Sequence, residues 1–196
     1  LIDFDHEWSK MVSARPATSN QWDSESVDPA EFQKYFVKHA RYTAGTAIQY
    51  APSLITGPAT YQELAQGFEI GTRFHSGPVI RLSDAKPVQL GSAVKADGRW
   101  RLFAFADKQS PAAPTSSIHA FCDFLGNAAE SPIVKFTRPN EDVDSVFDVR
   151  GIFQQGHRAI ELNNAPSLLL PAKGRYGLRD YEKIFCPDFT SGQDIF

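Results

Sequence analysis

Hydrophobic residues recur at three- and four-residue steps in the first fifty positions, which is the spacing of amphipathic helices. The first stripe predicts a helix over residues 1–14, which ends before Pro16 because the residue before a proline is pushed out of the helical region. This stripe consists of Leu1, Phe4, Trp8 and Met11. The serine-rich residues 15–27 that follow predict a loop.

A second stripe predicts a helix that starts at Asp28, a residue type that caps helix N-termini well. Its period continues from Phe32 to Tyr50, and Pro52 then ends it. Gly45 either weakens this helix or allows another part of the chain to approach it closely. We place a domain boundary just after the end of this predicted helix, near Thr56-Gly57-Pro58.

Short strand patterns alternate with helical ones in the remainder of the chain, which is typical of an α/β layer fold. Strands are predicted at 78–82, 99–106 and 146–153, and helices at 115–130 and 177–185, with one or two helical turns at 157–164. Residues 99–106 are apolar on both faces toward their end, which favours a central strand of the sheet. Asp97-Gly98 predicts the tight turn before it.

Composition and charge argue against several classes of partner for this chain. The 196 residues carry a net charge of -3 and no long basic stripe, which argues against nucleic acid and acidic membranes as partners. Apolar runs such as residues 167–170 are far too short to span a bilayer. Cys122 and Cys186 stand alone without a C-x-x-C, so we expect a reduced cytoplasmic setting and no disulfide framework.

The sequence contains no motif that defines a catalytic centre. There is no glycine fingerprint for a dinucleotide, no P-loop and no G-x-S-x-G turn. The Gly67–Gly71 stretch is interpreted as a surface turn, and Ser76-Gly77-Pro78 as a bend that leads into a strand. His119 and Cys122 share a helix face, but the remaining histidines are scattered, so we favour a buried structural cysteine over a zinc ligand or an attacking thiolate. No catalytic, cofactor-binding or metal-binding residue is therefore assigned.

One segment is unusually dense in basic, aromatic and acidic side chains. It runs from Lys173 to Glu182 and contains Arg175, Tyr176 and Arg179. Two glycines bracket Arg175, so an anion-binding turn is one interpretation. We favour an interface patch, because Tyr and Arg are enriched where protein surfaces meet.

Several stretches, taken in order along the chain, carry a resemblance to a known family. They are Leu1–Asp5, Phe32–Phe36, Thr43–Ala47, Tyr50–Ser53, Gly71–Phe74, Pro78–Pro87, Asp97–Arg101 and Gly174–Tyr181. This collinear set resembles the C-terminal third of the FAD-dependent aromatic hydroxylases, in the phenol 2-monooxygenase and 3-hydroxybenzoate 4-monooxygenase group.

The resemblance implies a thioredoxin-like domain at residues 58–196 that lacks the redox C-x-x-C and contributes to a homodimer. Residues 1–57 would then be the helical tail of the FAD- and substrate-binding domain, and the last strand of the family's sheet would lie beyond Phe196. The implied parent protein hydroxylates a phenol at the ortho or para position with NADPH, O₂ and FAD, in aromatic hydrocarbon catabolism. The family's flavin motifs and catalytic residues lie upstream of Leu1, so no cofactor is expected in this chain.

Both ends of the chain fall inside ordered-looking patterns, and we therefore expect an internal piece of a longer protein. The alternative is a free-standing thioredoxin-like binding module without redox activity, which would begin near Leu1. A thiol oxidoreductase that depends on Cys122 is a more distant alternative. The residues by themselves lead only to a soluble α/β chain with no catalytic centre of its own.

Overall fold

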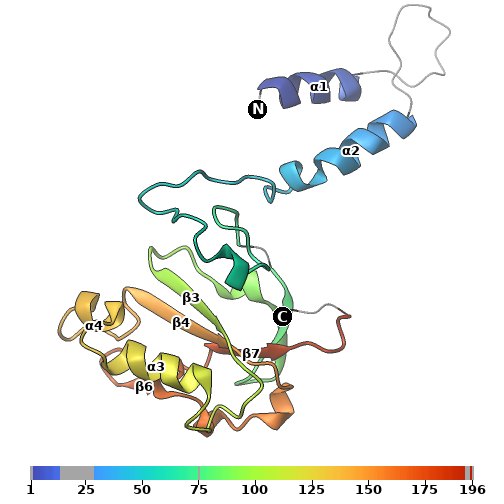
Figure 1. The fold of residues 1–196 in the computed structure, drawn as a ribbon. Helices are drawn as coiled ribbons and strands as arrows, with labels where there is room; N and C mark the ends of the chain where they lie inside the picture. Colours follow the sequence, from blue (N-terminus) through green and yellow to red (C-terminus); the bar gives the residue numbers. More distant parts are fainter. Residues whose placement is uncertain (1, 14–28, 75, 193–194, 196) are drawn as a thin grey trace, which may run out of the picture. The chain divides into compact units, whose positions relative to one another are not determined.

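The computed structural model describes residues 2–13, 29–74, 76–192 and 195 (Figure 1). The chain forms two compact units, Leu1–Phe74 and His75–Phe196, and each is described by itself. The predicted loop at 15–27 and the predicted cap Asp28 lie outside the described residues.

The N-terminal unit begins with two helices joined by an aromatic face. They are α1, Ile2–Ser13, and α2, Pro29–Thr43. The ring of Phe4 lies 4.6 Å from that of Tyr42, and Trp8 lies 5.7 Å from Phe32. Such ring pairs add stabilisation beyond the burial of their surface. The helical spacing in the sequence predicted this packing face correctly.

The second helix is shorter than predicted, because it ends at Thr43 and not near Tyr50. Gly45 has a φ of +69°, which ends the helix in the left-handed region that glycine adopts without strain. The amides of Thr46 and Ala47 both donate to the carbonyl of Arg41 and close the last turn.

Residues 45–74 fold without long regular elements, around the single 3-10 turn η1, Gln62–Leu64. The Gln62 side chain bonds the carbonyls of Ala65 and Phe68 and the amide of Ile70. Gly71, at φ +83°, passes so close to Tyr50 that an added Cβ would lie 2.3 Å from the Tyr50 carbonyl oxygen. The Gly67–Gly71 stretch is thus a turn, as predicted.

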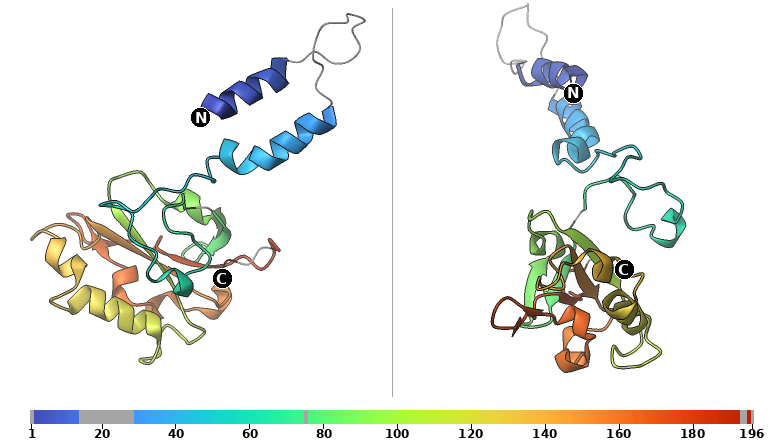
Figure 2. Two further views of the ribbon diagram at one scale, coloured as in Figure 1. Left: turned by 45° about the horizontal axis from the view of Figure 1, so that its top comes forward. Right: turned by 90° about the vertical axis from the view of Figure 1, so that its left-hand side faces the viewer.

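The C-terminal unit is built on a mixed five-stranded sheet in the order β2-β1-β7-β4-β3 (Figure 1, Figure 2). Its strands are β1 Pro78–Arg81, β2 Lys86–Gln89, β3 Trp100–Phe105, β4 Phe147–Ile152 and β7 Ile184–Pro187. β3, β4 and β7 run parallel, whereas β1 is antiparallel to both β2 and β7. A separate hairpin pairs β5, Ala172–Lys173, with β6, Leu178–Arg179.

Two helices and several short turns complete this unit. They are α3 Ser117–Asn127, α4 Pro132–Phe136, η2 Leu90–Ala93, η3 His157–Ala159, η4 Leu162–Asn164 and η5 Ser167–Leu169. The α/β fold class is confirmed, and so are the strands predicted near 78–82, 99–106 and 146–153. The helix predicted at 115–130 and the turns predicted at 157–164 are present as well.

The main core lies between α3, η5 and one face of the sheet. Buried residues of α3 pack there with Val149, Ile184 and Leu169. Gly151 allows η5 to approach β4, because a Cβ at this position would lie 2.8 Å from Leu169 Cδ1. Ser131 ties α3 to α4, since its hydroxyl donates to the Leu125 carbonyl and accepts from the Ile133 amide.

Two predictions are wrong. Residues 177–185 do not form a helix: Gly177 has a φ of +59°, and the segment contains β6 and enters β7, whose four residues are all buried. A strand buried on both faces has no polar alternation by which to recognise it. β3 lies at the edge of the sheet and not at its centre. Leu102 and Ala104 of β3 pack against the core, whereas Trp100 and Phe105 are exposed, so the apolar run does not require a strand on each side.

Candidate functional site

The face of the sheet opposite α3 carries charged side chains on its strands. In β4, Asp148 and Arg150 alternate with the core residue Val149 and the buried Gly151. Arg101 of β3 lies beside Asp148 in the strand register. Alternation places side chains two residues apart on the same face, so these three charges share one surface.

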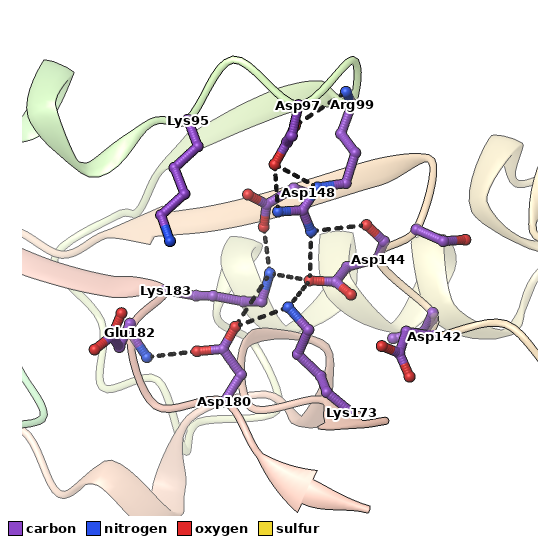
Figure 3. Close-up of polar contacts among 12 residues, drawn as sticks. Lys95, Asp97, Arg99, Asp142, Asp144, Asp148, Lys173, Asp180, Glu182 and Lys183 are labelled. Atoms are coloured by element: carbon purple, nitrogen blue, oxygen red, sulfur yellow. Dashed lines mark hydrogen bonds and ion pairs between the residues drawn. The ribbon is translucent and has the colours of Figure 1, made fainter. Parts of the chain in front are cut away.

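A buried lysine joins these charges into a network that Figure 3 shows. Lys183, directly before β7, is 1% exposed, and its ammonium donates to Asp144 Oδ2 at 2.5 Å and to Asp148 Oδ1. Asp148 also forms ion pairs with Arg101, whose Nε lies 2.9 Å from Asp148 Oδ2, and with Arg150 at 3.0 Å. Burial of a charge is costly unless it is paired, and in this network each buried charge has a partner.

The carboxylates of the network are held ionised. Burial acts to raise the pKa of Asp144, but hydrogen bonds from Lys183 and Lys173 outweigh it and lower that pKa below its ordinary value. Burial also acts to raise the pKa of Asp148, but the positive charges of Lys183 and Arg150 outweigh it and lower that pKa. Asp97 at the rim also has a lowered pKa, because Arg99 and Arg101 donate to it. A charged carboxylate whose pKa is lowered is a poor general base.

The network also fastens the β5–β6 hairpin to the sheet. Lys173 lies 3.0 Å from Asp144 and 3.3 Å from Asp180. At the start of the hairpin turn, the Gly174 amide donates to Asp142 Oδ1 at 2.7 Å. The hairpin is therefore held at its base by charged contacts to the loop before β4.

A groove of about 730 Å³ opens beside the network. Arg81, Arg150 and Phe185 lie along the sheet face, and residues 88–99 and 173–182 line its two sides. Its cations are largely neutralised by carboxylates of the same unit: Arg81, for example, pairs with Asp84 at 2.6 Å and with Glu182 at 3.3 Å. Lys95 has no ion-pair partner among the described residues, and in Figure 3 no dashed line reaches it.

The thiols do not supply chemistry in this arrangement. Cys122 of α3 and Cys186 of β7 are both buried, and burial raises the pKa of each to about 12. A protonated, buried thiol is inert as a nucleophile. His119 and Cys122 share a second, smaller cleft of about 220 Å³. Within the described ranges, no group of three His, Cys, Asp or Glu side chains is placed to hold a metal ion.

The sequence indicates one part of this site and gives little sign of the other. The segment Lys173–Glu182 was singled out, and the structure brings it to one side of the groove. The sequence does not single out Asp144, Asp148 and Lys183 as site residues. Lys183 lies more than thirty positions from the two aspartates, and charged residues are expected on the surface. A usable signal was present in the alternating charges of Arg99 and Arg101 and of Asp148 and Arg150 inside two predicted strands.

The fold and site define an α/β, thioredoxin-like module with no reactive thiol pair in its described residues. Residues 48–195 match the family described as "Phenol hydroxylase, C-terminal dimerisation domain", and the chain belongs to this family. The helices of the described part are all too short or too polar to cross a membrane.

Curated relatives agree with this assignment. The chain is 54% identical over its whole length to a 3-hydroxybenzoate 4-monooxygenase of Comamonas testosteroni, of which it covers 30%. It is 31% identical over 97% of its length to an FAD-dependent monooxygenase of Aspergillus terreus, covering 31% of it. A phenol 2-monooxygenase of Aspergillus fumigatus is 30% identical over 64% of the chain, which covers 20% of that protein. The chain thus spans less than a third of the length of these relatives.

Proposed function

We propose that this chain is the dimerisation and scaffold module of an FAD-dependent aromatic hydroxylase that acts on a phenol or hydroxybenzoate. The observation that carries the proposal is the joint match of residues 48–195 to a dimerisation domain and of the whole chain to 30% of a hydroxybenzoate monooxygenase. The complete protein would use NADPH and O₂, act as a homodimer and reside in the cytoplasm.

The division of labour follows from the side chains present. The charges of the Lys183 network are paired and both thiols are protonated, so neither set supplies an acid, base or nucleophile to a substrate. We therefore propose that hydroxylation takes place upstream, and that residues 1–57 are the helical tail of the flavin- and substrate-binding domain.

The groove does not fit a flavin. Flavin dinucleotides are held by a glycine-rich turn at a helix N-terminus, where backbone amides meet the pyrophosphate. The groove is lined by strands, a hairpin and a loop, and cations such as Arg81 and Lys173 already have carboxylate partners. FAD would supply the oxidation chemistry of the complete protein, and no step of that chemistry is assigned to this chain.

The test is to purify the complete natural protein and to compare it with the 196-residue chain alone. We expect flavin absorption bands in the complete protein, and we expect it to consume NADPH and O₂ when 3-hydroxybenzoate or phenol is added. The isolated chain should bind no flavin. A complete protein without flavin, of about the length of this chain, would contradict the proposal and support a free-standing binding module.

A further inference from the structure

The tip of the β5–β6 hairpin presents large side chains to solvent. Tyr176 is 80% exposed and Leu178 is 71% exposed. Arg175 lies over the Tyr176 ring, with its guanidinium carbon 5.7 Å from the ring centroid. Tyr and Arg are the residue types that most often contribute the binding energy of protein interfaces.

This exposed tip stands on a fixed base. Lys173 is clamped between Asp144 and Asp180, and the Gly174 amide is bonded to Asp142. On the other strand, the Asp180 amide donates to the Pro171 carbonyl. We call this hairpin tip, residues 175–179, the ridge. A ridge that is ordered before binding loses little conformational entropy when a partner binds.

The ridge adjoins the charged groove. Leu178 and Arg179 are hairpin residues, and they also line the groove. A two-fold symmetric interface uses the same patch on both copies, so the patch must be complementary to itself. A ridge beside a groove meets this requirement, because each ridge can enter the groove of the other copy.

The charges suit the same arrangement. Arg81, Arg99, Arg150 and Lys173 of the groove are paired within the unit. The Glu182 side chain, which also lines the groove, is 69% exposed and has one partner, Arg81, at 3.3 Å. The side chains of Arg175 and Arg179 form no ion pair within the described part of the chain. In a two-fold arrangement of two copies, these arginines would have exposed carboxylates such as Glu182 of the second copy as acceptors.

We propose that the hairpin tip, residues 175–179, is a contact of the homodimer and inserts into the charged groove of a second copy of this chain. The proposal rests on the dimerisation role proposed above and names the surface that carries it. It distinguishes this ridge from other exposed aromatic side chains of the unit, such as Phe124 of α3 and Phe136 of α4.

The experiment measures the dimer dissociation constant of the complete natural protein by analytical ultracentrifugation. The double variant Tyr176→Ser/Leu178→Ser removes the ridge, and the matched control Phe124→Ser/Phe136→Ser removes two exposed rings elsewhere. Loss of two central contacts should weaken the dimer at least about 30-fold, and the control should change it less than about threefold. Circular dichroism confirms that each variant remains folded.

A second readout uses the inertness of the native thiols. Leu178→Cys places an accessible thiol where ridge and groove meet, while Cys122 and Cys186 stay buried. A short bismaleimide should then link two chains, and the control Phe136→Cys should remain unlinked. A wild-type dimer that the ridge variant leaves intact overturns this inference alone. A wild-type protein that is monomeric overturns the dimerisation role as well.

Discussion

Replacing Lys183 by methionine should reveal how strongly the C-terminal unit depends on its buried charges. Methionine fills a similar volume but carries no charge, so Asp144 and Asp148 lose their shared cation. Removing one partner of a buried ion pair costs about 3–5 kcal/mol. Because Asp148 keeps Arg101 and Arg150, and Asp144 keeps Lys173, we expect a loss near the lower end, about 3 kcal/mol at pH 7.

The loss should depend on pH in a defined direction. The folded-state pKa values of Asp144 and Asp148 are lowered, so their stabilisation is present above the unfolded value near 4 and disappears as the pH falls through the folded values. Lys183 is the first cation responsible for that lowering. The difference between wild type and Lys183→Met should therefore shrink below about pH 4.

Native-state hydrogen exchange is the suitable assay, because it reports the opening free energy of β4 and β7 separately from the N-terminal unit. The reporters are the amides of Gly151 and Phe153, which donate to the backbone carbonyls of Lys183 and Phe185 across these strands. Lys135→Met, on an exposed lysine of α4, is the control and should stay within about 0.5 kcal/mol. A loss below about 1 kcal/mol for Lys183→Met, or a loss equal at pH 7 and pH 3, would refute the reasoning.

Three further outcomes are expected. Gly71→Ala should destabilise the 45–74 segment by about 2 kcal/mol or more, because of its positive φ and the close Tyr50 carbonyl, while Gly67→Ala should be neutral; limited proteolysis compares them. Ser131→Ala should lower stability by about 1–2 kcal/mol in thermal unfolding, since it leaves the Ile133 amide uncapped. Cys122 and Cys186 should react with a disulfide reagent at pH 8 only after denaturation, and rapid labelling of either in the native protein would contradict their burial.

Much of the fold was predictable because its periodic elements carry a local signal. The stripe through Phe4 and Trp8 predicted α1, and the apolar runs of β1, β3 and β4 predicted strands at their observed positions. β7 was missed because all four of its residues are buried, and Leu178, Tyr181 and Ile184 before and within it imitate a helical step. Local spacing cannot separate the two, since the distinction comes from which strands lie on either side.

The site was less predictable, for a physical reason. Lys183, Asp144 and Asp148 become neighbours only when β7 pairs beside β4. A charged residue is interpreted as exposed unless its partner is known, and that partner lies more than thirty positions away. The hairpin segment was recognisable in advance because its aromatic and basic residues are consecutive. Its role as a ridge beside a groove required the tertiary structure.

The most direct test of the central claim is the mass in solution of the complete natural protein, compared with a version that ends before residue 48. We expect the complete protein to sediment as a dimer with bound flavin, and the shortened protein to keep its flavin but to sediment as a monomer. A shortened protein that remains dimeric would show that residues 48–195 do not hold the two copies together.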